Sequence, residues 1–261
     1  MKPAIDKVLQ RLLTTYERRV LKKKPVPFGW AARLSSFEHN ATEREWQQLM
    51  YYTEIITRLR GVPGDVAEFG VAGGVSFLAF ARCLRVMERG FDKKEKRKLY
   101  GFDSFEGLPP LTELDKAPGV TDGQMKEGGF HVPAWYEPLF SFVEQEPSCH
   151  LVKGWFDQTL PRFLADNPHV SFALVHIDCD LYESTKVVLE QLWDRVVPGG
   201  LVVFDELFHK DYPGETLAYR EFFQSRSSEY AMHRSETKPD KKYLVKVGAA
   251  PTAARAAATS E

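Results

Sequence analysis

Residues 171–185 read SFALVHIDCDLYEST, and this stretch decides the class of fold. Its first part, FALVHI, is a nearly continuous apolar run, which is typical of a strand covered on both faces. Two aspartates, Asp178 and Asp180, then lead into a helical segment. A buried strand that runs into a helix indicates a βαβ unit and a mainly parallel sheet.

The same alternation of strand and helix extends on both sides of this stretch. Strands are expected at 65–70, 98–103, 149–154, 171–178 and 200–206. Helices are expected at 75–90, 137–146, 157–166, 181–196 and near 215–225. Two further β-like runs, near 229–233 and 242–247, could form a terminal hairpin on the sheet. The sequence therefore predicts an α/β fold that ends in an antiparallel hairpin.

Three segments lie outside this alternation. Residues 1–60 lack strand-like runs and contain a Thr42…Glu45 pattern resembling a capping box before an amphipathic helix, so we expect them to form a helical lid. The Gly- and Pro-rich connection 106–135 has the length of a functional loop. The low-complexity tail 249–261 is predicted to be disordered, which leaves 61–248 as the main domain.

Composition narrows the classes of partner. The 261 residues carry 35 basic and 36 acidic side chains, a balance that does not favour nucleic acid or an anionic membrane as partner. No apolar run approaches the roughly 18–20 residues that span a bilayer. The N-terminus lacks the features of a secretory signal, and three isolated cysteines indicate a reducing compartment. We therefore expect a cytoplasmic protein that acts on a small molecule.

The first strand runs into a glycine-rich turn, EFGVAGGVS, which contains Glu68, Gly70, Gly73 and Gly74. Glycines at such a turn let the backbone approach a ligand closely. The spacing matches neither the dinucleotide-binding GxGxxG nor the phosphate-binding P-loop. It fits the looser pattern E-x-G-x-A-x-G, which resembles the cofactor loop of class I S-adenosylmethionine methyltransferases. A turn that is glycine-rich only for tight packing is the alternative.

The ends of the second and third strands offer further cofactor contacts. Asp103 ends the second strand, where a carboxylate can accept hydrogen bonds from ribose hydroxyls. It could also be a turn residue that begins DSFEG. Trp155 and Phe156 follow the third strand, where an aromatic ring could stack on adenine or simply fill the core or a lid.

Three carboxylates end the fourth and fifth strands. Asp178 follows one, and Asp205 and Glu206 follow the other. Ligands of open α/β sheets bind outside the carboxyl ends of the strands, so these acids are expected at the rim that holds the glycine loop. Hard oxygen ligands of this kind suit Mg²⁺ or a similar cation, which would relieve their mutual repulsion.

The neighbouring polar residues divide into structural and chemical candidates. Asp180, with Glu183 three residues later, resembles a reciprocal capping box at a helix start. His176, inside the strand, is expected to be a buried, hydrogen-bonded histidine. His131 and His209 are better placed for proton transfer, although either could be a surface residue.

Four stretches together resemble the macrocin O-methyltransferase (TylF-type) family. They are VAEFGVAGGVS (66–76), LYGFDSFEGLPP (99–110), LVKGWFDQTLP (151–161) and HIDCDLYEST with VPGGLVVFDE (176–206). Those enzymes methylate sugar hydroxyls on macrolide antibiotics and related natural products. The resemblance covers roughly residues 60–225 and implies a class I, Rossmann-like, doubly wound fold.

The resemblance also implies a cofactor, S-adenosylmethionine, and a divalent metal, usually Mg²⁺. Transferred residue by residue, the cofactor site would comprise Glu68, Gly70, Gly73, Gly74, Ser76, Asp103, Ser104, Trp155 and Phe156. The metal carboxylates would be Asp178, Asp205 and Glu206. A homodimer is also favoured by the resemblance.

Two departures from the family pattern bear on these expectations. Family members often have one more residue between the valine and the Gly-Gly pair, and their last metal position is usually Asp-Asp, where this chain has Asp205-Glu206. We predict metal-assisted methyl transfer to a hydroxyl, with Asp178 as the preferred base and His131 or His209 in reserve. The alternatives are metal-independent transfer to a carboxylate or nitrogen, and a cofactor-binding module without catalysis.

Overall fold

The computed structural model describes residues 41–90, 96–117 and 123–248. The chain divides into two compact units, Met1–Gln47 and Gln48–Glu261, and the second contains the whole sheet. Most of the predicted lid and all of the predicted disordered tail lie outside the described residues. The predicted capping box is confirmed, because the N–H of Thr42 donates to Glu45 Oε2 at 2.7 Å and the N–H of Glu45 donates to Thr42 Oγ1 at 3.2 Å.

The second unit is built on a seven-stranded sheet with the order β3-β2-β1-β4-β5-β7-β6. Strands β1 to β5 pair in parallel, whereas β7 runs antiparallel to β5 and pairs with β6 as a hairpin. The predicted doubly wound fold and terminal hairpin are therefore confirmed. The strands are β1 (Asp65–Phe69), β2 (Leu99–Asp103), β3 (Cys149–Lys153), β4 (Phe172–Ile177), β5 (Val196–Phe204), β6 (Tyr230–Arg234) and β7 (Lys242–Lys246).

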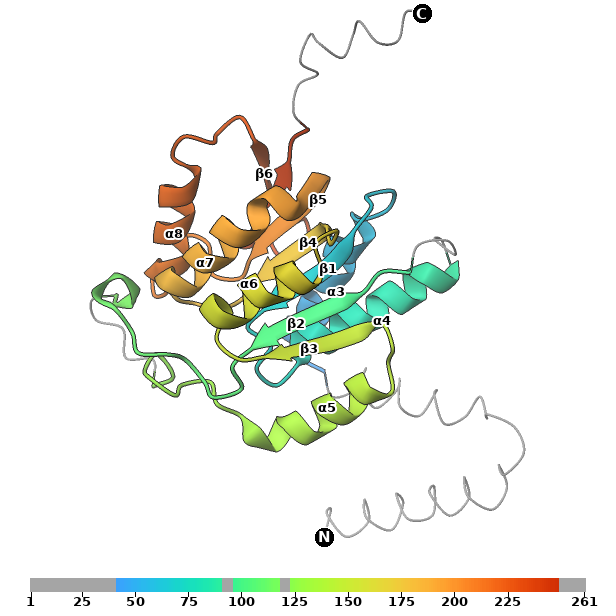
Figure 1. The fold of residues 1–261 in the computed structure, drawn as a ribbon, viewed down its shortest axis with the longest axis horizontal. Helices are drawn as coiled ribbons and strands as arrows, with labels where there is room; N and C mark the ends of the chain where they lie inside the picture. Colours follow the sequence, from blue (N-terminus) through green and yellow to red (C-terminus); the bar gives the residue numbers. More distant parts are fainter. Residues whose placement is uncertain (1–40, 91–95, 118–122, 249–261) are drawn as a thin grey trace, which may run out of the picture. The chain divides into compact units, whose positions relative to one another are not determined.

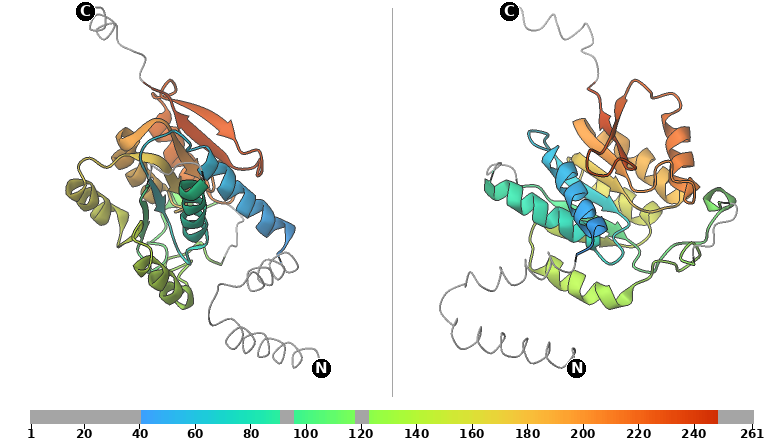
Figure 2. Two further views of the ribbon diagram at one scale, coloured as in Figure 1. Left: turned by 90° about the vertical axis from the view of Figure 1, so that its right-hand side faces the viewer. Right: turned by 180° about the vertical axis from the view of Figure 1, so that it is seen from behind.

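Different helices cover the two faces of the sheet (Figures 1 and 2). One face packs against α3, α4 and α5 around Ile55, Phe80 and Leu139. The other packs against α6, α7 and α8 around Leu160, Leu189 and Phe223. The helices are α3 (Glu43–Thr57), α4 (Val75–Gly90), α5 (Tyr136–Glu144), α6 (Phe156–Asp166), α7 (Tyr182–Leu192) and α8 (Pro213–Phe223). Because both faces are covered, β4 is buried along its whole length, as the apolar run FALVHI predicts.

The parallel register sets the position of the site. Phe69 on β1 pairs with Phe102 on β2 and with Ile177 on β4, and Ile177 pairs in turn with Phe204 on β5. These four strands therefore end level with one another, and the residues that follow them meet at one edge of the sheet. No helix in the described part of the chain is long and apolar enough to cross a membrane.

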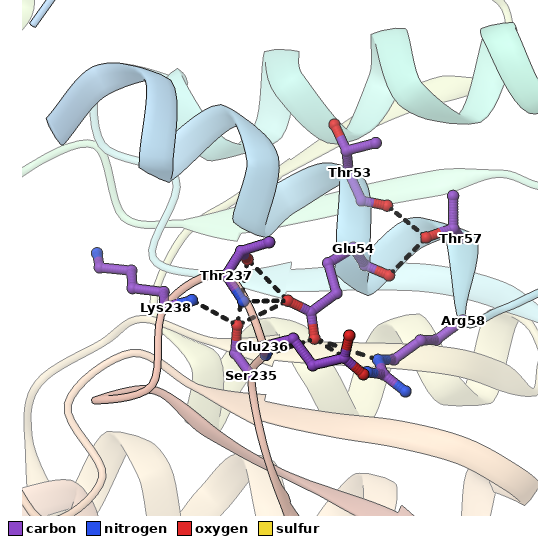
Figure 3. Close-up of polar contacts among 8 residues, drawn as sticks. All are labelled: Thr53, Glu54, Thr57, Arg58, Ser235, Glu236, Thr237 and Lys238. Atoms are coloured by element: carbon purple, nitrogen blue, oxygen red, sulfur yellow. Dashed lines mark hydrogen bonds and ion pairs between the residues drawn. The ribbon is translucent and has the colours of Figure 1, made fainter. Parts of the chain in front are cut away.

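Glu54 joins helix α3 to the turn between β6 and β7 (Figure 3). Its Oε2 accepts hydrogen bonds from the hydroxyl of Ser235 at 2.8 Å and from the N–H and hydroxyl of Thr237 at 3.0 and 2.7 Å. Its Oε1 accepts the N–H of Glu236 at 3.1 Å, and Arg58 pairs with both Glu54 and Glu236. This anchor, made by residues more than 180 positions apart in sequence, fixes α3 on the sheet.

The anchor is expected to make the protein acid-sensitive. Burial alone would raise the pKa of Glu54, but the hydrogen bonds from Thr237, Ser235 and Glu236 outweigh it and lower the pKa to about 2. The carboxylate therefore stabilises the fold above about pH 4.5, and this stabilisation is lost as the pH falls toward 2. Urea midpoints measured across this range should decline more steeply for the wild type than for Glu54→Gln. Glu144→Gln, on the exposed side of α5, should keep the wild-type profile.

Candidate active site

A cavity of about 700 Å³ opens at the carboxyl ends of the parallel strands. Its wall includes the residue that follows or ends each of four strands: Gly70 after β1, Asp103 on β2, Asp178 after β4 and Asp205 after β5. Trp155 and Phe156, which follow β3, line it as well. This is the edge at which open α/β sheets bind their ligands.

The glycine loop is held in place by Asp103. Its Oδ2 accepts the N–H groups of Val71 at 2.7 Å and Ala72 at 2.8 Å, and its Oδ1 accepts the N–H of Phe105 at 2.6 Å. Ala72 adopts a left-handed conformation with φ of 43°, which a residue with a Cβ rarely adopts outside a constrained site. The loop is thus shaped by the same carboxylate that was expected to bind ribose.

Gly70 makes the closest backbone approach in this loop. Its φ is +91°, and a Cβ at this position would lie 1.7 Å from the carbonyl oxygen of Asp178. Only a residue without a Cβ fits there, and the approach brings the β1 loop against the end of β4.

Most of the predicted cofactor residues meet at the cavity. Those that line it are Gly70, Gly73, Ser76, Asp103, Ser104, Trp155 and Phe156. Gly74 and Glu68 are not among its lining residues. A Cβ on Gly74 would meet Leu139 of α5 at 2.7 Å, so this glycine serves helix packing. Glu68 is fully buried, and its Oε1 lies 3.1 Å from His176 Nδ1.

The predicted cap at Asp180 is wrong. Helix α7 begins at Tyr182, and its N-cap residue is Leu181, which makes no side-chain cap hydrogen bond. Asp180 has a left-handed φ of 61°. The N–H of Tyr182 instead donates at 2.7 Å to Oδ1 of Asp115, which ends the short 3₁₀ helix Glu113–Asp115, 67 residues earlier. Asp180 lines the cavity beside Asp178. An Asp-x-x-Glu pattern is therefore not enough to cap a helix when a distant carboxylate takes the amide and the local backbone turns left-handed.

Sequence reasoning also missed the residues that shape the loop after β5. Glu215 is fully buried, and its Oε2 accepts the N–H of Glu206 at 2.9 Å. Thr216 Oγ1 accepts the N–H of Phe208 at 2.7 Å. Gly214 packs so closely that a Cβ would lie 2.6 Å from the amide nitrogen of Tyr182. The signal that could have identified them is the short motif PGET (213–216) at the start of a helix, directly after the predicted rim acids.

Lys241, which precedes β7, was also missed. Its Nζ lies 2.9 Å from Asp205 Oδ1 and 3.7 Å from Glu206 Oε1, and it donates to the main-chain oxygen of Asp205. Burial alone would lower the pKa of Lys241, but Asp205 and Glu206 outweigh it and raise it, so the amine is charged. Burial alone would raise the pKa of Asp205, but Lys241 outweighs it and lowers it.

The pKa values of the two neighbouring acids, Glu206 and Asp178, are shifted in the opposite direction. Burial raises the pKa of Glu206 to about 7, with Asp205 adding to the rise and Lys241 opposing it. Burial also raises the pKa of Asp178 well above its usual range, with Asp205 and Asp180 adding to the rise. The pKa of Asp205 is thus shifted in the opposite direction to those of Asp178 and Glu206, and Asp205 is the acid that Lys241 Nζ approaches to 2.9 Å.

The predicted magnesium set, Asp178, Asp205 and Glu206, lines the cavity but is not arranged as a ligand set. Two ligands of one Mg²⁺ lie at most about 4.2 Å apart. Among the described residues, the group with three ligand atoms within 4.8 Å of one another is Glu68, His176 and Asp178, which excludes Asp205 and Glu206. The Glu68–His176 part of that group is already a hydrogen-bonded pair.

The positive charge of Lys241 also opposes the binding of Mg²⁺. A Mg²⁺ bound about 2.1 Å from Asp205 Oδ1 would lie at most about 5 Å from the ammonium. The repulsion between these charges is about 7 kcal/mol at an effective dielectric constant of 20. Lys241 therefore competes with a metal for these carboxylates, and the residues as arranged do not fit Mg²⁺.

The histidines proposed for proton transfer lie outside the cavity wall. His131 is exposed, and its Nδ1 lies 3.4 Å from the hydroxyl of Tyr136. His209 is exposed, and its Nδ1 lies 3.7 Å from Glu206 Oε2. His176 is buried, as predicted, but only its Nδ1 has a hydrogen-bond partner among the described residues.

The cavity wall is strongly acidic. The carboxyl groups that line it belong to Asp103, Asp157, Asp178, Asp180, Glu183, Asp205 and Glu206. Within the described part of the chain, no lysine, arginine or histidine lines it. Such a wall favours cationic ligands and disfavours anionic ones.

The chain is similar in sequence and in fold to known proteins. The chain is 33% identical over 154 residues to 8-demethyl-8-(2,3-dimethoxy-alpha-L-rhamnosyl)-tetracenomycin-C 4'-O-methyltransferase of Streptomyces olivaceus, which covers 56% of this chain and 54% of that protein. The chain thus spans about half the length of the curated relatives it matches.

The match to solved structures is longer. The calicheamicin methyltransferase CalS11 superposes with a TM-score of 0.71 and 27% identity over 93% of each chain. An apo structure of CalS11, described as a TDP-rhamnose 3'-O-methyltransferase, gives a TM-score of 0.62 and 26% identity over 89% of this chain and 92% of that one. Residues 41–234 match the model of the macrocin O-methyltransferase (TylF) family, and the chain therefore belongs to this family.

Proposed function

We propose that this chain transfers a methyl group from S-adenosylmethionine to a hydroxyl oxygen of a small natural product, such as a sugar substituent, and that the acceptor is neutral or cationic. The observation that carries the proposal is the cavity, which brings the glycine loop, Asp103 and the acids after β4 and β5 to one edge of the sheet. The tetracenomycin relative, an O-methyltransferase by name, supports oxygen as the methylated atom.

The cavity suits the proposed cofactor in two respects. Its acidic wall can stabilise the positive charge of a sulfonium ion. Asp103 Oδ1 accepts one N–H in the structure, so it retains capacity for a ribose hydroxyl. Trp155 and Phe156, which line the cavity after β3, can flank an adenine ring.

One of the two aspartates after β4 is proposed to accept the proton of the acceptor hydroxyl. A general base must be ionised at the working pH and lie within reach of the hydroxyl. Burial, with Asp205 and Asp180 adding to it, raises the pKa of Asp178 and so disfavours its carboxylate form. We therefore assign the base to Asp180, which lines the cavity just before helix α7. When bound, S-adenosylmethionine supplies an electrophilic methyl group. As the oxygen attacks this carbon, Asp180 takes the hydroxyl proton and the carbon–sulfur bonding pair stays on sulfur.

The acidic wall of the cavity also limits the class of acceptor molecule. An anionic acceptor, such as a nucleoside-diphosphate sugar or a carboxylate, would meet the acidic wall without a basic side chain from the described residues to pair with. Methyl transfer to a carboxylate is disfavoured for the same reason. A glycoside with free hydroxyls, or one that carries an amine, meets no such repulsion.

The test uses the full chain and a panel of acceptors. Neutral glycosylated natural products, amine-bearing glycosides and nucleoside-diphosphate sugars would each be incubated with S-adenosylmethionine and analysed by mass spectrometry. We expect a product methylated on oxygen from the first two classes, formed with an equal amount of S-adenosylhomocysteine.

Other outcomes point to other functions. Cofactor binding seen by calorimetry, without a methylated product from any acceptor, would indicate a binding module and refute the enzyme. Methylation of nitrogen or of a carboxylate would refute the hydroxyl acceptor. The homodimer and the cytoplasmic location expected from the sequence stay predictions.

A further inference from the structure

Lys241 is placed in the acid cluster by a braced turn. The N–H of Lys241 donates to the carbonyl oxygen of Lys238 at 2.9 Å, and its own carbonyl oxygen accepts the N–H of Ser235 at 3.1 Å. Only 8% of the residue is exposed. It therefore differs from a surface lysine, whose ammonium is tethered loosely by a flexible side chain.

The same turn is fixed from its other side. Ser235 and Thr237 donate to Glu54 of α3, and the N–H of Lys238 donates to Ser235 Oγ at 2.9 Å (Figure 3). Lys242 on β7 pairs with Phe204 on β5, so the turn that precedes β7 lies beside the end of β5. The backbone that carries Lys241 is thus held by the helix, the hairpin and the central sheet together.

We propose that Lys241 is the built-in cation of this site and that methyl transfer by this chain needs no divalent metal. The ammonium contacts both Asp205 and Glu206 from the protein side, at 2.9 and 3.7 Å, and offsets negative charge that a metal would otherwise balance. It also donates to the main-chain oxygen of Asp205, so the lysine is held by the backbone as well as by the carboxylates. Lys241 acts through these acids and is a positioning residue: it keeps Asp205 and Glu206 in place and leaves proton removal to a cavity carboxylate.

The inference rests on the proposed site, but its main measurement does not need turnover. Mn²⁺ would be titrated into the full-length wild type and into Lys241→Met and Lys241→Arg, with bound metal followed by electron paramagnetic resonance. We expect weak binding by the wild type and Lys241→Arg, and at least about tenfold tighter binding by Lys241→Met, because this variant frees two carboxylates. Adding Asp205→Asn to Lys241→Met should remove the gain, which a purely structural role of the lysine would not produce.

Activity gives the second readout. Wild-type transfer should survive exhaustive chelation with EDTA and should not rise when Mg²⁺ is added. One tight Mn²⁺ site in the wild type, with activity lost on chelation and restored by Mg²⁺, would overturn the proposal. Equal, weak binding by the wild type and Lys241→Met would also overturn it, because Lys241 would then not be what keeps metal out.

Two controls keep the test decisive. If Lys241→Met does not fold, the wild-type titration and the charge-conserving Lys241→Arg still decide the matter, since a tight site in either overturns the proposal. Absence of transfer to every acceptor would refute the proposed function, whereas the Mn²⁺ measurement would still answer the question about Lys241.

Discussion

The Gly70→Ala variant is expected to lose about 2 to 6 kcal/mol of folding free energy and to fail to bind S-adenosylmethionine. Roughly 1–3 kcal/mol comes from forcing alanine into a left-handed conformation, and roughly 1–3 from overpacking. The added methyl would lie 1.7 Å from the carbonyl oxygen of Asp178, so the β1 loop and the end of β4 must separate. Urea unfolding followed by circular dichroism measures the loss.

A second glycine separates the two causes of this loss. Gly61 has a similar φ of +74°, but a Cβ there meets no atom within 4 Å. Gly61→Ala should therefore lose only the conformational part, about 1–3 kcal/mol, and should keep cofactor affinity. Equal losses in the two variants would show that the contact with Asp178 does not decide the stability of the loop.

The Asp180→Asn variant is expected to fold normally and to lose methyl transfer by about a hundred- to ten-thousand-fold in kcat. Asparagine tolerates the left-handed φ of 61° as aspartate does, and no cap is lost because Asp180 does not cap α7. Kinetics at saturating cofactor would measure the loss, and calorimetry with S-adenosylhomocysteine should show unchanged affinity. A fully active Asp180→Asn enzyme would refute the base assignment.

Asp115→Ala provides the matching contrast. Asp115 accepts the N–H of Tyr182 and, on its other oxygen, the N–H and hydroxyl of Thr112 at 2.8 and 2.7 Å. Its removal leaves these donors without their acceptor, which should cost about 1–3 kcal/mol of stability. If Asp180→Asn lost stability and Asp115→Ala did not, Asp180 would be the structural residue and Asp115 would not hold the start of α7.

Much of the fold could be predicted because its signals are local. The apolar run FALVHI predicted a buried strand, and the change to helical spacing after Asp180 predicted the helix that follows. The rim residues Gly70, Asp103, Asp178 and Asp205 could be placed as well, because parallel strands bring their carboxyl ends to one edge. In each case the physical cause lies within a few residues of the feature predicted.

The rest depends on partners that are distant in sequence. Asp180 and Glu183 have the letters of a capping box, but the amide at the helix start is taken by Asp115. Lys241 lies in the charged run KPDKKY, whose composition is that of a solvated surface. Only the antiparallel pairing of β5 and β7 brings it beside Asp205. No local pattern encodes these contacts, so the character of the acid cluster could not be derived from sequence.

The anchor between Glu54 and the β6–β7 turn has a consequence for synthesis. Helix α3 leaves the ribosome before any strand of the sheet, yet the groups that hold Glu54, at 235–237, are made about 180 residues later. The cavity residue Tyr52 lies on that helix, and Lys241 lies just beyond the turn. A nascent chain can therefore assemble the central parallel strands early, but the cavity is completed only when the last hairpin has emerged and its turn has met Glu54.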